Sequence, residues 1–160
     1  MKTTAIILAS GSGSRFGGDI PKQFQMLAGK PVYSHSVDAF LSHKPVDSLV
    51  IVVHPDYRND LETKLQPSRK PLIVVTGGAS RQESAFIGLQ AARTFLPDAV
   101  LIHDAARPFF SKKLIDRVLD GLVSATAVSP VIAVTDTLYE VTENGFFIRA
   151  VGRHNLRRVQ

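Results

Sequence analysis

The chain has 160 residues, a formal net charge of +5, 44% hydrophobic and 21% charged residues, and no cysteine. This composition argues against a disordered chain and suits one globular domain with a substantial core. The lack of cysteine excludes disulfides, thiolate catalysis and cysteine-ligated zinc. No apolar run reaches the length of a membrane span, and the first residues carry no cleavable signal pattern. We therefore expect a cytoplasmic protein that does not bind membranes.

The positive charge is compatible with two kinds of partner, nucleic acid and small anionic molecules. The basic residues are scattered along the chain, and the only dense basic cluster lies at 153–158. A nucleic-acid interface usually gathers Lys and Arg on one face, with aromatic residues among them, and this sequence has few aromatics near its basic groups. We therefore expect an anionic small-molecule substrate and no nucleic acid.

Predicted strands and helices alternate along the first 134 residues. From the N-terminus we expect strand 4–8, helix 31–43, strand 46–53, helix 56–65, strand 72–75, helix 80–96, strand 98–102, helix 111–122 and strand 128–134. This alternation predicts an α/β fold in three layers, with helices flanking a mostly parallel sheet. Pro130 places the last of these strands at an edge or at a bulge, because proline cannot donate to a strand ladder.

A glycine-rich loop follows the first strand. Residues 9–22 hold four glycines, three serines and two cations, Arg15 and Lys22. Glycine lets backbone N–H groups approach an anion closely, and the two cations add charge. A dinucleotide fingerprint fails here because Phe16 replaces its third glycine, and a Walker loop fails because Asp19 replaces its lysine. We interpret the loop as a triphosphate site. The alternative is an ordinary βα connection, although those are usually shorter.

Two later strand ends add candidates to the same edge of the sheet. Gly77-Gly78 precedes a capping box that runs from Ser80 to Glu83, so the unpaired N–H groups of that helix start face the edge that carries the first loop. A plain tight turn is the alternative. Asp104 follows strand 98–102, where ligands bind in open α/β sheets, and its carboxylate is a candidate metal ligand. The alternative for Asp104 is a helix cap or a turn former.

The segment 137–151 predicts a β-hairpin rather than another βα unit. Two apolar stretches flank Asn144-Gly145, a residue pair suited to a type I′ turn. A two-stranded ribbon is marginal alone in water, so this one must pack on something. One alternative is an antiparallel addition to the main sheet, and the other is an arm that clasps a second subunit.

These motifs resemble those of a known family. Residues 8–15, followed by Pro21-Lys22-Gln23-Phe24, resemble the signature of nucleotidylyltransferases that join a nucleoside triphosphate to a phosphorylated sugar or polyol. Further segments resemble motifs of the 2-C-methyl-D-erythritol 4-phosphate cytidylyltransferases in the same order: 77–84, 103–108, 134–138, and Arg153 with 159–160. The resemblance covers nearly the whole chain. The segment 103–108 alone is shared with ribitol-5-phosphate cytidylyltransferases.

The resemblance implies a Rossmann-like nucleotidyltransferase that transfers a cytidylyl group from CTP to 2-C-methyl-D-erythritol 4-phosphate and releases pyrophosphate, in the non-mevalonate route to isoprenoid precursors. It implies that Arg15 and Lys22 are catalytic and that Asp104 lies at Mg²⁺. The CTP-binding residues that it implies are Ala9, Ser10, Gly11, Gly13, Gly78, Ala79 and Ser84. The substrate-positioning residues are Arg153, Asp104, Thr137 and Arg107. It also implies a homodimer in which the hairpin reaches across to the second subunit.

The sequence departs from the family pattern in two places. Leu8 and Ser10 stand where proline and alanine or glycine are usual, a small change that we do not expect to alter the chemistry. Family domains also continue beyond the position of residue 160 and carry a further lysine there. We therefore expect a single domain, 1–160, truncated at its C-terminus relative to the family. It is either a fragment, such as the N-terminal part of a bifunctional fused enzyme, or a domain of impaired activity. Two alternative functions stay open: a ribitol-5-phosphate or other sugar-phosphate nucleotidylyltransferase, and a catalytically incomplete CTP-binding fragment.

Overall fold

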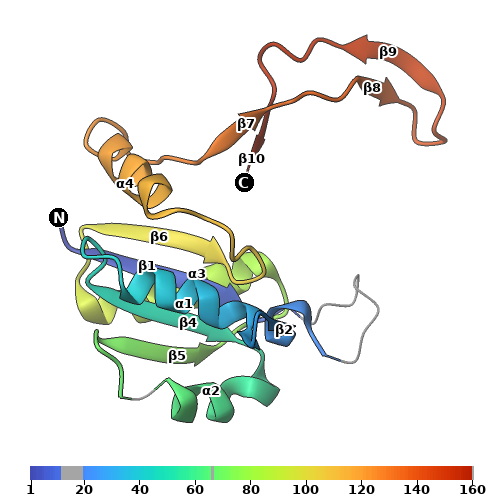
Figure 1. The fold of residues 1–160 in the computed structure, drawn as a ribbon. Helices are drawn as coiled ribbons and strands as arrows, with labels where there is room; N and C mark the ends of the chain where they lie inside the picture. The colour runs from blue at the N-terminus through green and yellow to red at the C-terminus, as the bar shows by residue number, and fades with distance from the viewer. Residues whose placement is uncertain (12–19, 66, 160) are drawn as a thin grey trace. The chain divides into compact units, whose positions relative to one another are not determined.

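The computed structural model describes residues 1–11, 20–65 and 67–159. The chain forms two compact units, Met1–Lys112 and Lys113–Gln160, which we call the sheet unit and the arm unit and describe separately (Figure 1). Among the residues that the structure describes, no helix is long and apolar enough to cross a membrane.

The sheet unit is built on four parallel strands in the order β5-β4-β1-β6. These are β1 (Thr3–Ala9), β4 (Ser48–Val53), β5 (Leu72–Thr76) and β6 (Ala99–Asp104). Every residue of β1 and β4 is buried, as expected for parallel strands that are covered on both faces. In the register, Ala5 of β1 lies between Leu49 of β4 and Leu101 of β6.

Helices flank this sheet, as the alternating pattern predicts. The helices are α1 (Val32–Leu41), η3 (Pro55–Tyr57), α2 (Arg58–Lys64), α3 (Arg81–Ala92) and η4 (Arg93–Phe95). Figure 1 shows α1 and α3 on opposite faces of the sheet. On the α3 face, Ile6, Val52 and Ala92 belong to one buried apolar cluster. A Cβ atom at Gly88 would lie 2.6 Å from Ile6 Cγ2, so glycine is what lets α3 lie so close to β1. The predicted α/β architecture is confirmed.

Between β1 and α1 lie two short features, the 3₁₀ turn η2 (Lys22–Phe24) and a small antiparallel pair, β2 (Met26–Leu27) with β3 (Lys30–Pro31). The predicted helices 31–43 and 111–122 extend one or two residues beyond α1 and α4 (Lys112–Gly121) at each end. The predicted helices 56–65 and 80–96 each combine a 3₁₀ turn with an α-helix, η3 with α2 and α3 with η4. One strand boundary matters for the site, because β6 runs two residues beyond the predicted end at residue 102. His103 and Asp104 still pair with Ile7 and Leu8 of β1, so Asp104 is the last residue of its strand.

The arm unit contains most of α4 (Lys112–Gly121) and two antiparallel strand pairs. The pairs are β7 (Val131–Ala133) with β10 (Arg157–Val159), and β8 (Leu138–Val141) with β9 (Phe147–Val151). The predicted strand 128–134 is shorter in the structure and starts after Pro130. Neither pair belongs to the four-stranded sheet. The hairpin is therefore not an addition to the main sheet among the described strands.

The turn of the hairpin differs from the predicted type. The N–H of Gly145 donates to the Thr142 carbonyl oxygen at 2.9 Å, and Gly145 has a φ of +82°. A type I′ turn would also need a positive φ at Asn144, but the described non-glycine residues with positive φ are Ala28 and Leu96. The loop is instead a type I turn followed by a glycine in the left-handed region, a common three-residue hairpin connection. The prediction of a hairpin is confirmed, and the turn type was wrong.

Candidate active site at the carboxyl ends of the parallel strands

The strand order places the candidate residues at one edge of the sheet unit. The connections run from β1 outward to β4 and β5, and then return to β6 on the other side of β1. Open α/β sheets bind ligands beyond the carboxyl ends of their strands, where the order reverses in this way. Ala9 ends β1, Thr76 ends β5 just before Gly77-Gly78, and Asp104 ends β6. The three motifs found in the sequence therefore share this edge.

A hydrogen-bonded network joins two of the predicted CTP-binding loops. The Ser10 hydroxyl donates to Ser84 Oγ at 2.8 Å, and the Gly78 N–H donates to the same oxygen at 3.1 Å. A Cβ atom at Gly77 would lie 2.4 Å from the Cβ of Ser10, so only glycine allows this approach. The structure thus brings Ser10, Gly78 and Ser84 together.

Ser84, a predicted CTP-binding residue, is buried at the start of α3. It is 1% exposed, and its hydroxyl contacts Ser10 and both backbone groups of Gly78, including the Gly78 carbonyl oxygen at 3.4 Å. In this arrangement Ser84 holds the two loops against each other. A direct contact between Ser84 and CTP stays a prediction.

The start of α3 confirms the capping signal and adds a detail. Ser80 Oγ accepts the N–H of Glu83 at 3.0 Å, as a capping box requires. Glu83 Oε2 accepts the N–H of Ala79 at 2.8 Å, whereas a standard capping box would use the N–H of Ser80. A Cβ atom at Gly78 would lie 2.3 Å from Glu83, so the carboxylate occupies the space that a side chain at Gly78 would need. The Glu83 carboxylate is thus hydrogen-bonded to the backbone N–H of Ala79, a predicted CTP-binding residue.

Asp104 is held by two arginines at the end of β6. Asp104 Oδ1 lies 2.9 Å from an Arg81 guanidinium nitrogen and accepts the Arg81 Nε–H at 3.0 Å, while Oδ2 lies 3.4 Å from Arg107 Nε. The Asp104 side chain is 31% exposed, and both arginines are more exposed. No role was predicted for Arg81 from the sequence. Its place one residue after the helix cap, beside the same edge, was the available signal.

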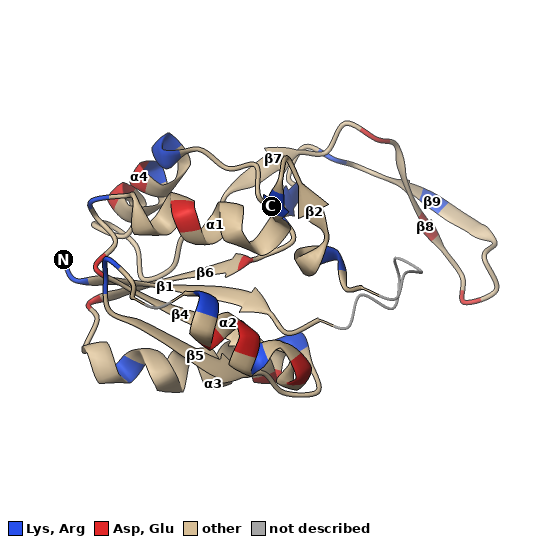
Figure 2. Cartoon of the chain, turned by 60° about the horizontal axis from the view of Figure 1, so that its bottom comes forward, with Lys and Arg blue, Asp and Glu red and all other residues tan. Residues whose placement is uncertain are grey.

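The end of β6 is acidic (Figure 2), and its carboxylate fits a magnesium ion that arrives with a nucleotide. Among the described residues, no group of three or more His, Cys, Asp or Glu side chains could hold a metal ion. Mg²⁺ needs no such group, because it usually binds through one or two carboxylates, several waters and substrate phosphates. Asp104 supplies one carboxylate, and the arginines that surround it favour phosphate oxygens nearby.

His103 supports the strand end from inside. Its ring lies 5.5 Å from the Phe40 ring and 4.4 Å from the Phe110 ring, and Nε2 lies 3.2 Å from Ser36 Oγ. Burial lowers the pKa of His103 from its ordinary value, although the neighbouring Asp104 opposes this shift. A neutral imidazole in this packing fixes the segment that carries Asp104.

The catalytic candidates of the first loop fall in two classes. Arg15 and Gly13 lie outside the described residues. Lys22 is the first residue of η2 and is exposed, whereas the next residue, Gln23, is 5% exposed. Gln23 Nε2 donates to the carbonyl oxygens of Ala9 at 2.8 Å and Gly11 at 2.6 Å. The turn that presents Lys22 is therefore fastened to the start of the glycine-rich loop.

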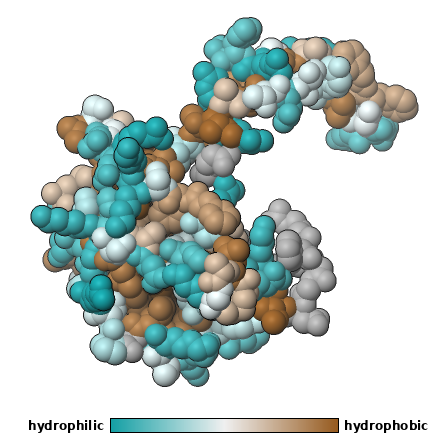
Figure 3. Space-filling view, viewed as in Figure 1, coloured by the Kyte–Doolittle hydropathy of each residue, from teal (hydrophilic) through white to brown (hydrophobic). Residues whose placement is uncertain are grey.

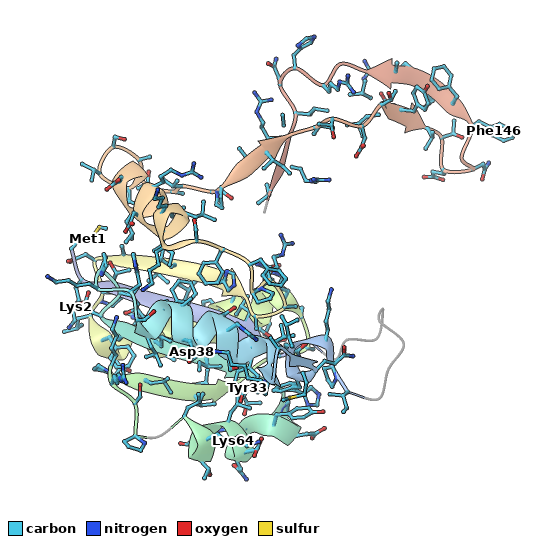
Figure 4. All side chains as sticks on the ribbon, viewed as in Figure 1. Met1, Lys2, Tyr33, Asp38, Lys64 and Phe146 are labelled. Atoms are coloured by element: carbon cyan, nitrogen blue, oxygen red, sulfur yellow. The ribbon has the colours of Figure 1, made fainter. Side chains whose placement is uncertain are left out.

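The remaining substrate-positioning candidates belong to the arm unit. Thr137 and Arg153 are exposed and lie just outside the two strands of the hairpin. Arg153 Nη1 donates to the carbonyl oxygen of Thr135, so the two sides of the hairpin base lie together. Figure 3 shows hydrophobic residues gathered on the surface of this hairpin, and Phe146, labelled in Figure 4, lies at its tip.

Comparison with known proteins identifies one family. The family model "IspD: 2-C-methyl-D-erythritol 4-phosphate cytidylyltransferase" matches residues 3–160. The chain is 43% identical over 160 residues to the enzyme of that name from Roseobacter denitrificans, covering 100% of this chain and 70% of the relative. It is 40% identical over 161 residues to the bifunctional enzyme IspD/IspF of Brucella anthropi, covering 99% of this chain and 40% of the relative.

Solved structures agree with this match. The crystal structure of 4-diphosphocytidyl-2C-methyl-D-erythritol synthase from Anaerococcus prevotii superposes with a TM-score of 0.84 at 25% identity, covering 99% of this chain and 67% of that chain. The bifunctional IspDF of Campylobacter jejuni gives a TM-score of 0.76 at 25% identity, covering 100% of this chain and 39% of that chain.

The chain spans about 40% of the length of its bifunctional relatives and about 70% of its monofunctional ones. The family model nevertheless matches almost every residue of the chain, and it includes the three strand ends at which the candidate site lies. The chain therefore belongs to the 2-C-methyl-D-erythritol 4-phosphate cytidylyltransferase (IspD) family.

Proposed function

We propose that this chain transfers a cytidylyl group from CTP to 2-C-methyl-D-erythritol 4-phosphate and releases pyrophosphate, as a step toward isoprenoid precursors. The observation that carries the proposal is the convergence of three motifs at one edge of the sheet. Ser10 contacts Ser84 and Gly78 contacts the same hydroxyl, while Arg81 bridges from the start of α3 to Asp104 at the end of β6. This edge combines backbone amides with cations, as a triphosphate site requires.

The reaction joins two anions, so charge is the main obstacle. A phosphate oxygen of the polyol phosphate attacks the α-phosphorus of CTP, the new P–O bond forms, and the bond from the α-phosphorus to the oxygen bridging the β-phosphorus breaks. The electron pair leaves with pyrophosphate. A phosphate monoester is already ionised at neutral pH, so no general base is needed. This agrees with a site that offers cations and backbone donors rather than an acid–base pair.

Lys22 and Arg15 are the residues that we assign to the developing charge. Lys22 is exposed at the start of η2, and Gln23 fastens that turn to the loop that begins at Ser10. Fixed donors directed at transition-state charge typically contribute about 3–4 kcal/mol each. A lysine acts here as a point charge, whereas an arginine can bind two phosphate oxygens at once.

We assign Asp104 to a magnesium ion that accompanies CTP. When bound, Mg²⁺ neutralises phosphate charge and orients the phosphate oxygens. Arg81 and Arg107 keep the Asp104 carboxylate at the end of β6, because Arg81 contacts one of its oxygens and Arg107 the other. The two arginines also keep positive charge beside the place where the triphosphate binds.

We further assign the hairpin 137–151 to a homodimer interface. Several apolar side chains on it are at least half exposed in the single chain: Tyr139, Val141, Phe146, Phe147 and Ile148. The Tyr139 and Phe147 rings meet at 5.1 Å, and an exposed apolar surface of this kind usually marks an interface. Arg153, at the base of the hairpin, would bind the substrate phosphate in the second subunit.

One assay tests the assignment and separates it from the alternatives. Pyrophosphate release is measured with CTP, Mg²⁺ and 2-C-methyl-D-erythritol 4-phosphate, and then with ATP or GTP, or with ribitol 5-phosphate. We expect turnover with CTP and the methylerythritol phosphate, and at least tenfold less with each substitute. Comparable turnover with a purine nucleotide or with ribitol 5-phosphate would overturn the assignment. Binding of CTP without pyrophosphate release would identify a catalytically incomplete domain.

A further inference from the structure

We propose that Gln23 is a positioning residue that sets the geometry of the start of the glycine-rich loop, residues 9–11, together with that of Lys22. This inference rests on the proposed function, because it concerns the same triphosphate site. Gln23 is 5% exposed, and a buried amide must place its N–H groups on acceptors. Both of its described contacts are to backbone oxygens of the first loop, those of Ala9 and Gly11.

The two acceptors lie on either side of Ser10. The side-chain nitrogen of Gln23 donates to the carbonyl oxygens of both Ala9 and Gly11, at 2.8 Å and 2.6 Å. These two carbonyl groups, one before Ser10 and one after it, are therefore fixed relative to each other. In a trans peptide the N–H points opposite to the C=O. The N–H of Ser10 is therefore directed away from Gln23, and Gln23 determines where this donor of the loop points.

The same clamp is connected to the second CTP-binding loop. Ser10, held between the two clamped carbonyls, donates its hydroxyl to Ser84, and Ser84 accepts the N–H of Gly78. A continuous path therefore runs from Gln23 through Ser10 to the loop that follows β5. A displacement of the Ser10 backbone would move the Ser84 contact as well.

On its other side, Gln23 is part of the turn that carries Lys22. The following residue, Phe24, stacks on Tyr57 with ring centroids 3.9 Å apart and 13° between the planes, and it meets Tyr33 edge-on at 5.6 Å. In a 3₁₀ turn successive side chains point about 120° apart, so one residue can face inward while its neighbours do not. Gln23 fastens the turn to β1, and Phe24 fastens it to α1 and η3. Lys22 is thus carried on a backbone that is fixed from two sides.

The experiment compares substitutions at Gln23 with matched substitutions at Gln25. Gln23→Met removes both donors at similar side-chain length, and Gln23→Glu replaces the donor by a carboxylate that faces two carbonyl oxygens. Gln25 is two residues away, and its amide lies 3.4 Å from the Ile20 carbonyl at an exposed position. Gln25→Met and Gln25→Glu therefore make the same chemical changes without touching the loop start.

The first readout is independent of activity. In the ligand-free protein, we expect Gln23→Met to shift the backbone amide resonances of Ser10, Gly11 and Gly78 and to increase their hydrogen exchange at least tenfold, while Gln25→Met leaves them unchanged. If Gln23→Met fails to fold, Gln23→Asn replaces it, since an amide shorter by one methylene cannot reach both carbonyls. Unchanged amides at Ser10 and Gly11 in a folded Gln23 variant would overturn the proposal.

The second readout separates positioning from a purely structural role. We expect kcat to fall about 10²-fold in Gln23→Glu, since small misplacements of a catalytic group cost rate of this order, while Gln25→Glu keeps the wild-type kcat. A Gln23→Glu variant that is less stable but keeps the wild-type kcat would overturn the proposal. If the wild-type protein itself transfers no cytidylyl group, the proposed function fails, and the amide readout alone decides the role of Gln23.

Discussion

Strands β4 and β9 have similar apolar content and opposite surroundings. β4 pairs with a strand on each side, and all six of its residues are buried. Among the described strands, β9 pairs with β8 alone, and four of its five residues are exposed. The sheet unit therefore buries its apolar strands within one chain. The hairpin leaves most of its apolar side chains exposed, and this is the surface that we propose as a dimer interface.

The pattern of the hairpin agrees with this difference. Glu140 and Arg149 pair across the strands at 2.6 Å. A register shift at Glu140/Val141 then places Phe147 opposite Val141, where its ring contacts Tyr139. The irregularity therefore collects aromatic and apolar side chains on the face away from the ion pair. A hairpin that served only to cap a sheet edge would have no need of such a face.

The largest expected effect compares one residue type in the two environments. Ile51 of β4 is 0% exposed and Ile148 of β9 is 50% exposed. We expect Ile51→Ala to lower the free energy of unfolding by about 2–5 kcal/mol, because it leaves a cavity between packed layers. Ile148→Ala should change it by less than about 0.5 kcal/mol in dilute protein. Urea unfolding, followed by circular dichroism, measures both changes. Equal changes in the free energy of unfolding would contradict the difference between the two strands.

The second prediction compares one cation from each unit. We expect Lys22→Ala to lower turnover by roughly 10²–10³-fold, because it removes a charge that acts on the transition state. Arg149→Ala removes a cation of an exposed ion pair on the hairpin, and such pairs contribute about 0–1 kcal/mol. Its turnover should stay within about threefold of wild type. Steady-state assays of the two variants give the answer, and near-native turnover of Lys22→Ala would remove this residue from the mechanism.

The smallest expected effect concerns association of the hairpin. We expect Phe147→Ser to weaken the dimer at least tenfold, or about 1.4 kcal/mol, because it removes an exposed aromatic from the proposed interface. Glu140→Gln, on the other face, should change the dissociation constant by less than about threefold. Sedimentation equilibrium gives both values. A wild-type protein that stays monomeric at high micromolar concentration would contradict the proposed interface.

The sequence was sufficient for the sheet because its signals are local. The apolar segment 46–53 predicts a buried strand, observed as β4, and Ser80 with Glu83 predicts the start of α3, where Ser80 caps the N–H of Glu83. Asp104 could also be placed at the ligand-binding edge from the sequence. Strands that alternate with helices are parallel, so their carboxyl ends share one edge of the sheet, and ligands bind at that edge.

The contacts of the site that the sequence did not predict join residues that lie far apart in the chain. Arg81 reaches Asp104 over 23 positions, and Ser36 reaches His103 over 67. The role that we propose for Gln23 could not be predicted for another reason: both of its described hydrogen-bond partners are backbone carbonyls, which carry no sequence signal. The turn of the hairpin was predicted wrongly because Asn144-Gly145 is compatible with two connections, and the choice depends on whether Glu143 joins the loop.

The central place of β1 has a consequence during protein synthesis. This strand is made before its partners: the Thr4 and Ser48 hydroxyls are 44 positions apart, and Lys2 and Asp98 are 96 apart. The ribosome adds about 5–20 residues per second, so β6 is synthesised about 5–20 s after β1. Meanwhile an apolar strand edge stays uncovered on the growing chain, where it can pair with other chains. The yield of folded protein therefore depends on how this interval is protected, and not only on the stability of the finished sheet.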